Sequence, residues 1–74
     1  MNDQDLVRMA NQIADYYRPY PEDEAVAGIA VHIRSFWDPR MRDGLSRHVA
    51  AGGEGLSPLA LKATRSLLEP QPAP

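Results

Sequence analysis

The sequence predicts an all-α fold, a small bundle of three to four short helices followed by a disordered, proline-rich C-terminal tail. Apolar residues recur at helical spacing in four segments, and no stretch shows the alternation of a half-buried β-strand. A proline stands at the start of the second, third and fourth segments, where it costs a helix no hydrogen bond. We therefore expect a single helical domain over residues 1–69 and a disordered tail over residues 70–74.

The first helix is expected from about Asp3 to Tyr17, and two prolines that flank Tyr20 end it. Its apolar face consists of five residues at helical spacing: Leu6, Met9, Ile13, Tyr16 and Tyr17. We expect Tyr16 to face the core of the bundle. Tyr17 and Tyr20 are expected to present their rings to another surface, because a tyrosine ring combines an apolar body with a polar tip.

The second helix is expected to begin near Pro21 and to end near Phe36–Trp37, with the acids Glu22–Glu24 at the positive end of its dipole. One face is apolar: Ala25, Val26, Ile29, Ile33 and Phe36. The opposite side also lacks charge, since it carries Ala27, Ala30 and Val31. This helix is therefore predicted to be covered on two sides, by its own bundle and by another chain.

A capping residue followed by proline predicts the start of the third helix and the start of the fourth helix. Asp38–Pro39 starts the third helix, and Gly52–Gly53 ends it. Its apolar stripe is narrow: Met41, Leu45 and Val49. Ser57–Pro58 starts the fourth helix, where Leu56 is placed to pack on Leu61 as a hydrophobic staple. The fourth helix has a wider apolar arc than one neighbouring helix usually covers.

Composition argues against several classes of chemistry. The chain has no cysteine, which excludes a disulfide, an iron–sulfur cluster and a thiolate zinc site. Its two histidines, His32 and His48, are too few for a closed metal site, and both are best explained as packing residues at the edges of apolar faces. No serine or threonine is visibly paired with either histidine. We expect no catalytic residue, no cofactor-binding residue and no metal ligand in this chain.

The net charge and the length of the apolar segments limit the kinds of partner that this chain can have. A net charge of −2 argues against nucleic acid, which requires a basic surface. No segment approaches the length of a membrane span, and the acidic N-terminal segment does not resemble a signal peptide. The expected location is cytoplasmic. A chain of 74 residues buries a small core, so added stability is expected from association with another chain.

Two further motifs have more than one explanation. Glu22–Glu24 could bind a divalent cation, but three adjacent acids at a helix start point in different directions, and dipole compensation explains them better. Gly52–Gly55 resembles a phosphate cradle only in composition. It lacks the preceding strand and the following lysine and hydroxyl of a P-loop, so a flexible helix–helix connection is the better interpretation.

The corner between the second and third helices carries the residue types that dominate protein interfaces. Tryptophan and arginine are over-represented among interface hot spots, and here one tryptophan is surrounded by three arginines. Trp37 fits the core of this chain equally well. Eight residues form the predicted partner interface: Tyr17, Tyr20, Val31, Arg34, Trp37, Asp38, Arg40 and Arg42.

Three segments, in this order and spacing, resemble the delta subunit of the soluble NAD-dependent, molybdenum-containing formate dehydrogenases. They are DLVRMANQIADYY, YPEDEAVAGIAVHIRSFWDPRMR and HVAAGGEGL. The resemblance covers about residues 5–68, and FWDPRMR followed by HVAAGG is its most specific part. Val31 and Ser57 depart from the pattern, because the family is expected to carry an acidic residue at both positions.

The resemblance implies a non-catalytic accessory subunit that docks on the large, molybdenum-containing subunit and supports its assembly or cofactor-loaded state. In that family the large subunit carries bis-molybdopterin guanine dinucleotide and iron–sulfur clusters, and other subunits carry FMN and bind NAD. A second hypothesis is a self-associating helical domain that buries its apolar surplus in a homodimer. A third, a nucleic-acid-binding regulator that uses Arg34, Arg40, Arg42 and Arg47, is disfavoured by the acidic balance.

Overall fold

The computed structural model describes residues 2–68. It contains four α-helices: α1 (Asp3–Tyr17), α2 (Glu22–Phe36), α3 (Pro39–Ala50) and α4 (Pro58–Leu68). No strand occurs within this range, which confirms the predicted all-α class. The predicted disordered tail, residues 70–74, lies outside the described residues.

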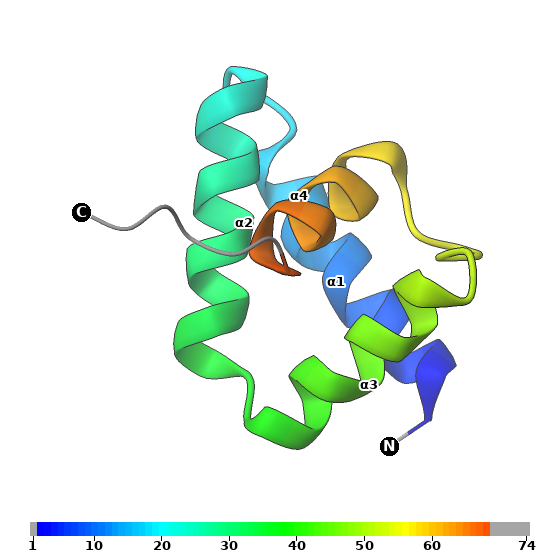
Figure 1. Cartoon of the computed structure of the whole chain (residues 1–74). Helices are drawn as coiled ribbons and strands as arrows, with labels where there is room; N and C mark the ends of the chain where they lie inside the picture. The colour runs from blue at the N-terminus through cyan, green and yellow to red at the C-terminus, as the bar shows by residue number, and fades with distance from the viewer. Residues whose placement is uncertain (1, 69–74) are drawn as a thin grey trace.

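The helices pack around a centre formed by α1 and α4, each of which contacts all three other helices. Figure 1 shows α2 along one side of the molecule, α4 against it, α1 passing behind α4, and α3 across the base. The contact between α2 and α4 is the most extensive one between two helices. This arrangement leaves one long side of α2 without a neighbouring helix.

Side-chain caps fix the starts of three helices. The side chains of Asn2, Asp38 and Ser57 each accept a hydrogen bond from the backbone N–H three residues ahead, at 2.9, 2.9 and 3.2 Å. The caps at Asp38 and Ser57 confirm the two cap-and-proline starts that the sequence predicts. Helix α2 has no side-chain cap and begins directly after Pro21.

The core is built largely from small side chains. Of the eleven buried apolar residues within residues 2–68, six are alanine, so the helix backbones approach closely. The large buried side chains are Trp37, Ile29, Ile33, Leu6 and Leu45. Thr64 is also fully buried, and its hydroxyl donates a hydrogen bond to the carbonyl oxygen of Ala60 at 2.8 Å. No helix within residues 2–68 combines the length and apolar character needed to cross a bilayer.

Two expectations about the core were wrong. Tyr16 is 68% exposed, whereas Tyr17 packs against the core. The reason is that Ala10 and Ala14, which the apolar pattern did not count, centre the buried face of α1 on the side of Tyr17. Phe36, expected on the inner face of α2, is 75% exposed, because the helix ends there and Trp37 enters the core instead.

The open side of α2 is also smaller than expected. Of the three residues that the sequence places there, Ala27 and Val31 are exposed, whereas Ala30 is buried. Val31 is 53% exposed, so the structure retains an apolar side chain on the outer face of this helix.

Candidate docking surfaces

Three tyrosines form a cluster at the C-terminal end of α1. The ring centroids of Tyr16 and Tyr17 lie 5.1 Å apart in an edge-to-face arrangement, and Tyr20 lies 5.3 Å from Tyr17 and 6.3 Å from Tyr16. A hydrogen bond to the side chain of Tyr16 is the main cause that raises the pKa of Tyr20 above its ordinary value. A tyrosine is uncharged at neutral pH even at its ordinary pKa, so this upward shift leaves the charge of Tyr20 unchanged.

The cluster is seated on α2 through a glycine. A Cβ atom at Gly28 would lie 2.5 Å from Cε1 and 2.7 Å from Cζ of Tyr17, closer than non-bonded carbons approach. Only a residue without a side chain lets the ring rest on this turn of α2. Gly28 thus allows α1 and α2 to approach closely. The Tyr17 ring that rests on it also contacts the rings of the two exposed tyrosines, Tyr16 and Tyr20.

Replacing Gly28 with alanine is expected to destabilise the fold by about 1 kcal/mol. The added methyl group overpacks the contact with Tyr17, which costs about 1–3 kcal/mol, while the better helix propensity of alanine returns about 1 kcal/mol. Urea denaturation followed by circular dichroism measures the difference. In a Tyr17→Ala background, the same Gly28→Ala change should instead stabilise the chain. Stabilisation in both backgrounds would show that the ring does not rest on Gly28.

Beside the cluster, α1 and α2 enclose an open groove of about 520 Å³, here called the α1–α2 groove. Its lining contains no lysine, arginine or carboxylate: Met9, Gln12, Ile13, Tyr16, Tyr17, His32 and Trp37. At its margin the exposed ring of Phe36 packs on His32, with centroids 4.8 Å apart. Burial of aromatic surface of this kind contributes strongly to protein association.

The corner between α2 and α3 presents unpaired arginines. Arg34, Arg40 and Arg42 form no ion pair with any carboxylate of residues 2–68, whereas Arg8, Arg18 and Arg47 do. The Nε atom of Arg42 is buried and has no hydrogen-bond partner in the described part of the chain. Arg34 and Arg40 are exposed.

The structure separates the eight predicted interface residues into different roles. Trp37 is only 5% exposed and belongs to the core, so it forms part of the groove wall and does not project from it. Asp38 caps α3 and is exposed. Tyr20, in the connection between α1 and α2, and Val31, on α2, are both exposed.

Two exposed aromatic residues were missing from the predicted interface. Tyr16 and Phe36 are the most exposed large apolar residues in the described chain. Both lie near helix ends. There the apolar face of the helix extends past the neighbouring helix that covers the rest of that face. That position is the only signal in the sequence that distinguishes them from core residues.

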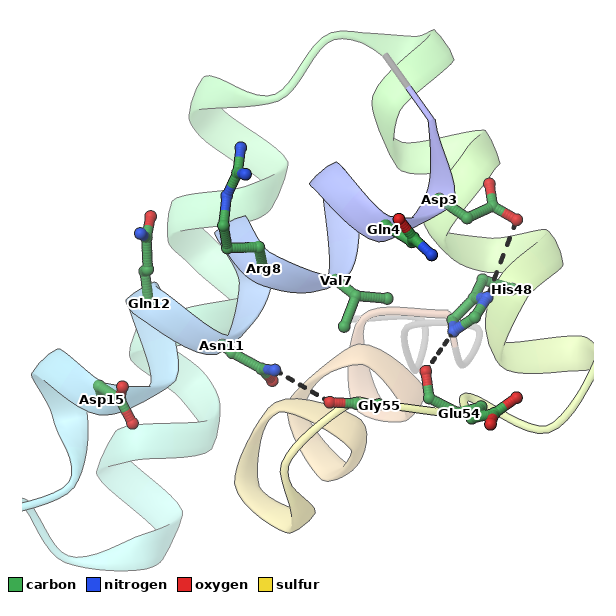
Figure 2. A pocket seen from close by; sticks show the side chains of 10 residues that line it. All are labelled: Asp3, Gln4, Val7, Arg8, Asn11, Gln12, Asp15, His48, Glu54 and Gly55. Atoms are coloured by element: carbon green, nitrogen blue, oxygen red, sulfur yellow. Dashed lines mark hydrogen bonds and ion pairs between the residues drawn. The ribbon is translucent and has the colours of Figure 1, made fainter.

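A second face is formed where the glycine-rich connection between α3 and α4 lies against α1 (Figure 2). Gly52, Gly53 and Gly55 all have positive φ angles, of 122°, 68° and 88°. Asn11 holds the connection with both ends of its amide: Nδ2 donates to the carbonyl oxygen of Gly55 at 2.9 Å, and Oδ1 accepts from the backbone N–H of Ser57 at 2.8 Å.

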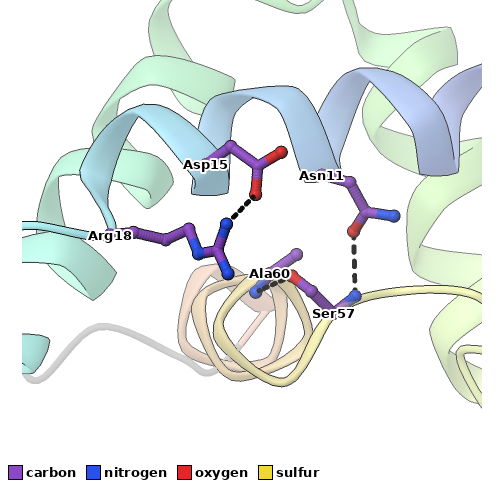
Figure 3. Close-up of polar contacts among 5 residues, drawn as sticks. All are labelled: Asn11, Asp15, Arg18, Ser57 and Ala60. Carbon is purple, nitrogen blue, oxygen red and sulfur yellow. Dashed lines mark hydrogen bonds and ion pairs between the residues drawn. The ribbon is translucent and has the colours of Figure 1, made fainter.

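Figure 3 shows the hydrogen bond between Asn11 and Ser57, which lies just before the start of α4. The same view shows the exposed ion pair of Asp15 and Arg18, at 3.6 Å.

His48 holds the other side of the connection. Its Nε2 lies 2.7 Å from the carbonyl oxygen of Glu54, and its Nδ1 lies 3.8 Å from a carboxylate oxygen of Asp3. The glycine-rich segment is therefore tied to α1 and α3 by side chains, contacts that its composition did not indicate.

The polar groups on this second face serve the fold. His48 and Asn11 form their hydrogen bonds with the connection, and the hydroxyl group of Ser57 accepts a hydrogen bond from the backbone of α4. Within residues 2–68, no group of three or more histidine, aspartate or glutamate side chains is arranged to hold a metal ion. The features that distinguish the surface are thus an aromatic groove that no lysine, arginine or carboxylate lines and a set of unpaired arginines, which suit protein binding.

Comparison with known proteins assigns the chain to a family. A family model described as NADH-dependent formate dehydrogenase delta subunit FdsD matches residues 5–64, from the first turn of α1 into α4. No curated protein and no solved structure gives a significant match. The matched segment covers most of the chain and includes the whole α1–α2 groove and the arginine corner. The chain therefore belongs to the FdsD family, the delta subunits of NADH-dependent formate dehydrogenases.

Proposed function

We propose that this delta subunit is a non-catalytic component that docks on the large, molybdenum-containing subunit and supports its assembly or cofactor-loaded state. The observation that carries the proposal is the exposure of large apolar side chains on α1, on α2 and on the connection between them. Tyr16, Tyr20, Val31 and Phe36 are 68%, 46%, 53% and 75% exposed. A chain with so small a core gains stability when a partner covers such residues.

The eight residues predicted from the sequence remain the proposed contact region, with distinct tasks. Tyr20 and Val31 contact the partner directly, while Tyr17 and Trp37 support the surface from beneath. Arg34, Arg40 and Arg42 pair with carboxylates of the partner, and Asp38 fixes the start of the helix that carries two of them. Bis-molybdopterin guanine dinucleotide, the iron–sulfur clusters, FMN and NAD are then held by other subunits.

Purification of the chain from its native host through a C-terminal tag tests this function. We expect a large subunit to co-purify, together with molybdenum and formate-dependent reduction of NAD. Depleting the delta subunit should lower the molybdenum content of the large subunit. Recovery of the chain alone as a defined dimer would overturn the proposal and favour the homodimer hypothesis, in which the exposed apolar residues bury one another.

Replacing Val31 with glutamate is expected to reduce co-purification of the large subunit without unfolding this chain. Val31 lies on the outer face of α2, and glutamate is a good helix former, so helicity should change little. The charge must then be desolvated when a partner covers this face. Gln4→Glu, which adds the same charge at an exposed position of α1, serves as the control. Equal recovery with both variants would show that no partner covers the outer face of α2.

A further inference from the structure

We propose that the α1–α2 groove is where the large subunit docks, and that it receives an uncharged, apolar anchor segment flanked by a carboxylate that pairs with Arg40. This inference rests on the proposed function. It adds the location of the contact and the chemistry of the partner segment.

The chemistry of the lining selects an apolar anchor. None of the side chains that line the groove is a carboxylate, a lysine or an arginine, in a chain in which 24% of the residues are charged. A charged group inserted there would lose its hydration without gaining an opposite charge. The larger hollow on the other side of α1 differs in character, because Asp3, Arg8, Asp15 and Glu54 line it.

The rims of the groove add aromatic contact area. Tyr16 is part of the lining, and Phe36 packs on His32, which is another lining residue. Both rings are mostly exposed, yet each is held in place by a packed neighbour, Tyr17 in the case of Tyr16. Rings that are already oriented lose little conformational freedom on binding, and tyrosine is enriched among interface hot spots.

An exposed arginine, Arg40, lies in the chain just after the Trp37 wall of the groove. A second hollow is lined by Leu6, Asp38, Arg40 and Met41. The two hollows share no lining residue, but Asp38 of the second directly follows Trp37 of the groove in the chain. A partner carboxylate that lies beyond the Trp37 wall of the groove can therefore pair with Arg40.

Arg40 is available for that carboxylate. It forms no ion pair with the carboxylates of residues 2–68, and the Asp38 side chain beside it accepts a hydrogen bond from the backbone of Met41. An arginine left unpaired beside an apolar groove suits bidentate pairing with a partner carboxylate.

The groove is tested with Tyr16→Glu and Phe36→Glu, each measured for binding to the purified large subunit. We expect either change to weaken binding about ten-fold or more. Leu68→Glu, which adds the same charge at an exposed apolar residue of α4, should change binding less than about two-fold. Tyr16→Ala and Phe36→Ala repeat the test without a new charge, and circular dichroism verifies that every variant keeps its helices.

The carboxylate is tested with Arg40→Glu against Arg65→Glu, an exposed arginine of α4. Only Arg40→Glu should weaken binding, by about three- to ten-fold, and the loss should shrink at high salt. Wild-type binding by the Tyr16 and Phe36 variants would overturn the groove while the proposed function stands. Wild-type binding by Arg40→Glu would overturn the carboxylate. Failure of the unmodified chain to bind the large subunit would overturn the inference together with the proposed function.

Discussion

Replacing Trp37 with alanine is expected to unfold the isolated chain at room temperature. Trp37 is the largest buried side chain in a core in which six of eleven buried apolar residues are alanine. Truncating a buried tryptophan to alanine costs about 3–5 kcal/mol. A single core of this size supplies a similar total, roughly 3–5 kcal/mol. The loss of helical signal at 222 nm and of a cooperative urea transition provides the measurement.

Phe36→Ala is the matched control, because Phe36 precedes Trp37 in the chain and is 75% exposed. An exposed substitution of this kind usually changes stability by less than about 0.5 kcal/mol. Trp37→Phe should fall between the two variants, since it keeps most of the apolar volume. Equal stability of Trp37→Ala and Phe36→Ala would show that Trp37 does not support the fold, and would favour a direct role of its ring in binding.

Replacing Asn11 with alanine is expected to lower the free energy of unfolding by about 1–3 kcal/mol, from two hydrogen bonds at about 0.5–1.5 kcal/mol each. Its side chain joins α1 to the carbonyl oxygen of Gly55 and to the backbone N–H of Ser57, at 2.9 and 2.8 Å. Without it, the start of α4 loses its attachment to α1. Urea denaturation measures the stability, and amide hydrogen exchange at Ser57 should accelerate because that N–H loses its acceptor.

Gln12→Ala is the control for Asn11, because Gln12 is the next residue of α1, is exposed, and its side chain forms no hydrogen bond within residues 2–68. Asn11→Asp separates the two contacts. It keeps the acceptor for Ser57 and loses the donor to Gly55, so exchange at Ser57 should stay slow. Equal destabilisation by Asn11→Ala and Gln12→Ala would contradict the role assigned to the amide.

The helix boundaries were predictable because proline and capping residues encode them locally. Pro21, Asp38–Pro39 and Ser57–Pro58 each lie where the structure starts a helix. The direction of side chains at helix ends was less predictable. Phe36 and Trp37 are both large and apolar, but only the turn into α3 determines that Trp37 enters the core and Phe36 does not.

The surfaces depend on contacts between segments that are distant in the sequence. The apolar periodicity of a single helix carries no information about such contacts. The seat of Tyr17 on Gly28 joins two helices, and the contacts of Asn11 span more than forty residues of sequence. The sequence did indicate that α2 carries apolar residues on two sides and that arginines gather near Trp37. It did not indicate that α1 would supply Tyr16 as the exposed edge of a groove.

The central claim, that the α1–α2 groove docks on the large subunit, is tested most directly by photochemical cross-linking within the intact complex. Phe36 is replaced by the photoreactive phenylalanine analogue p-benzoylphenylalanine, since its ring is exposed at the groove margin. The same probe at Arg47, on the outer side of α3, is the control. We expect the Phe36 probe, and not the Arg47 probe, to form a covalent product with the molybdenum-containing subunit. A product joining two copies of this chain, or a product with the large subunit only from Arg47, would contradict the claim.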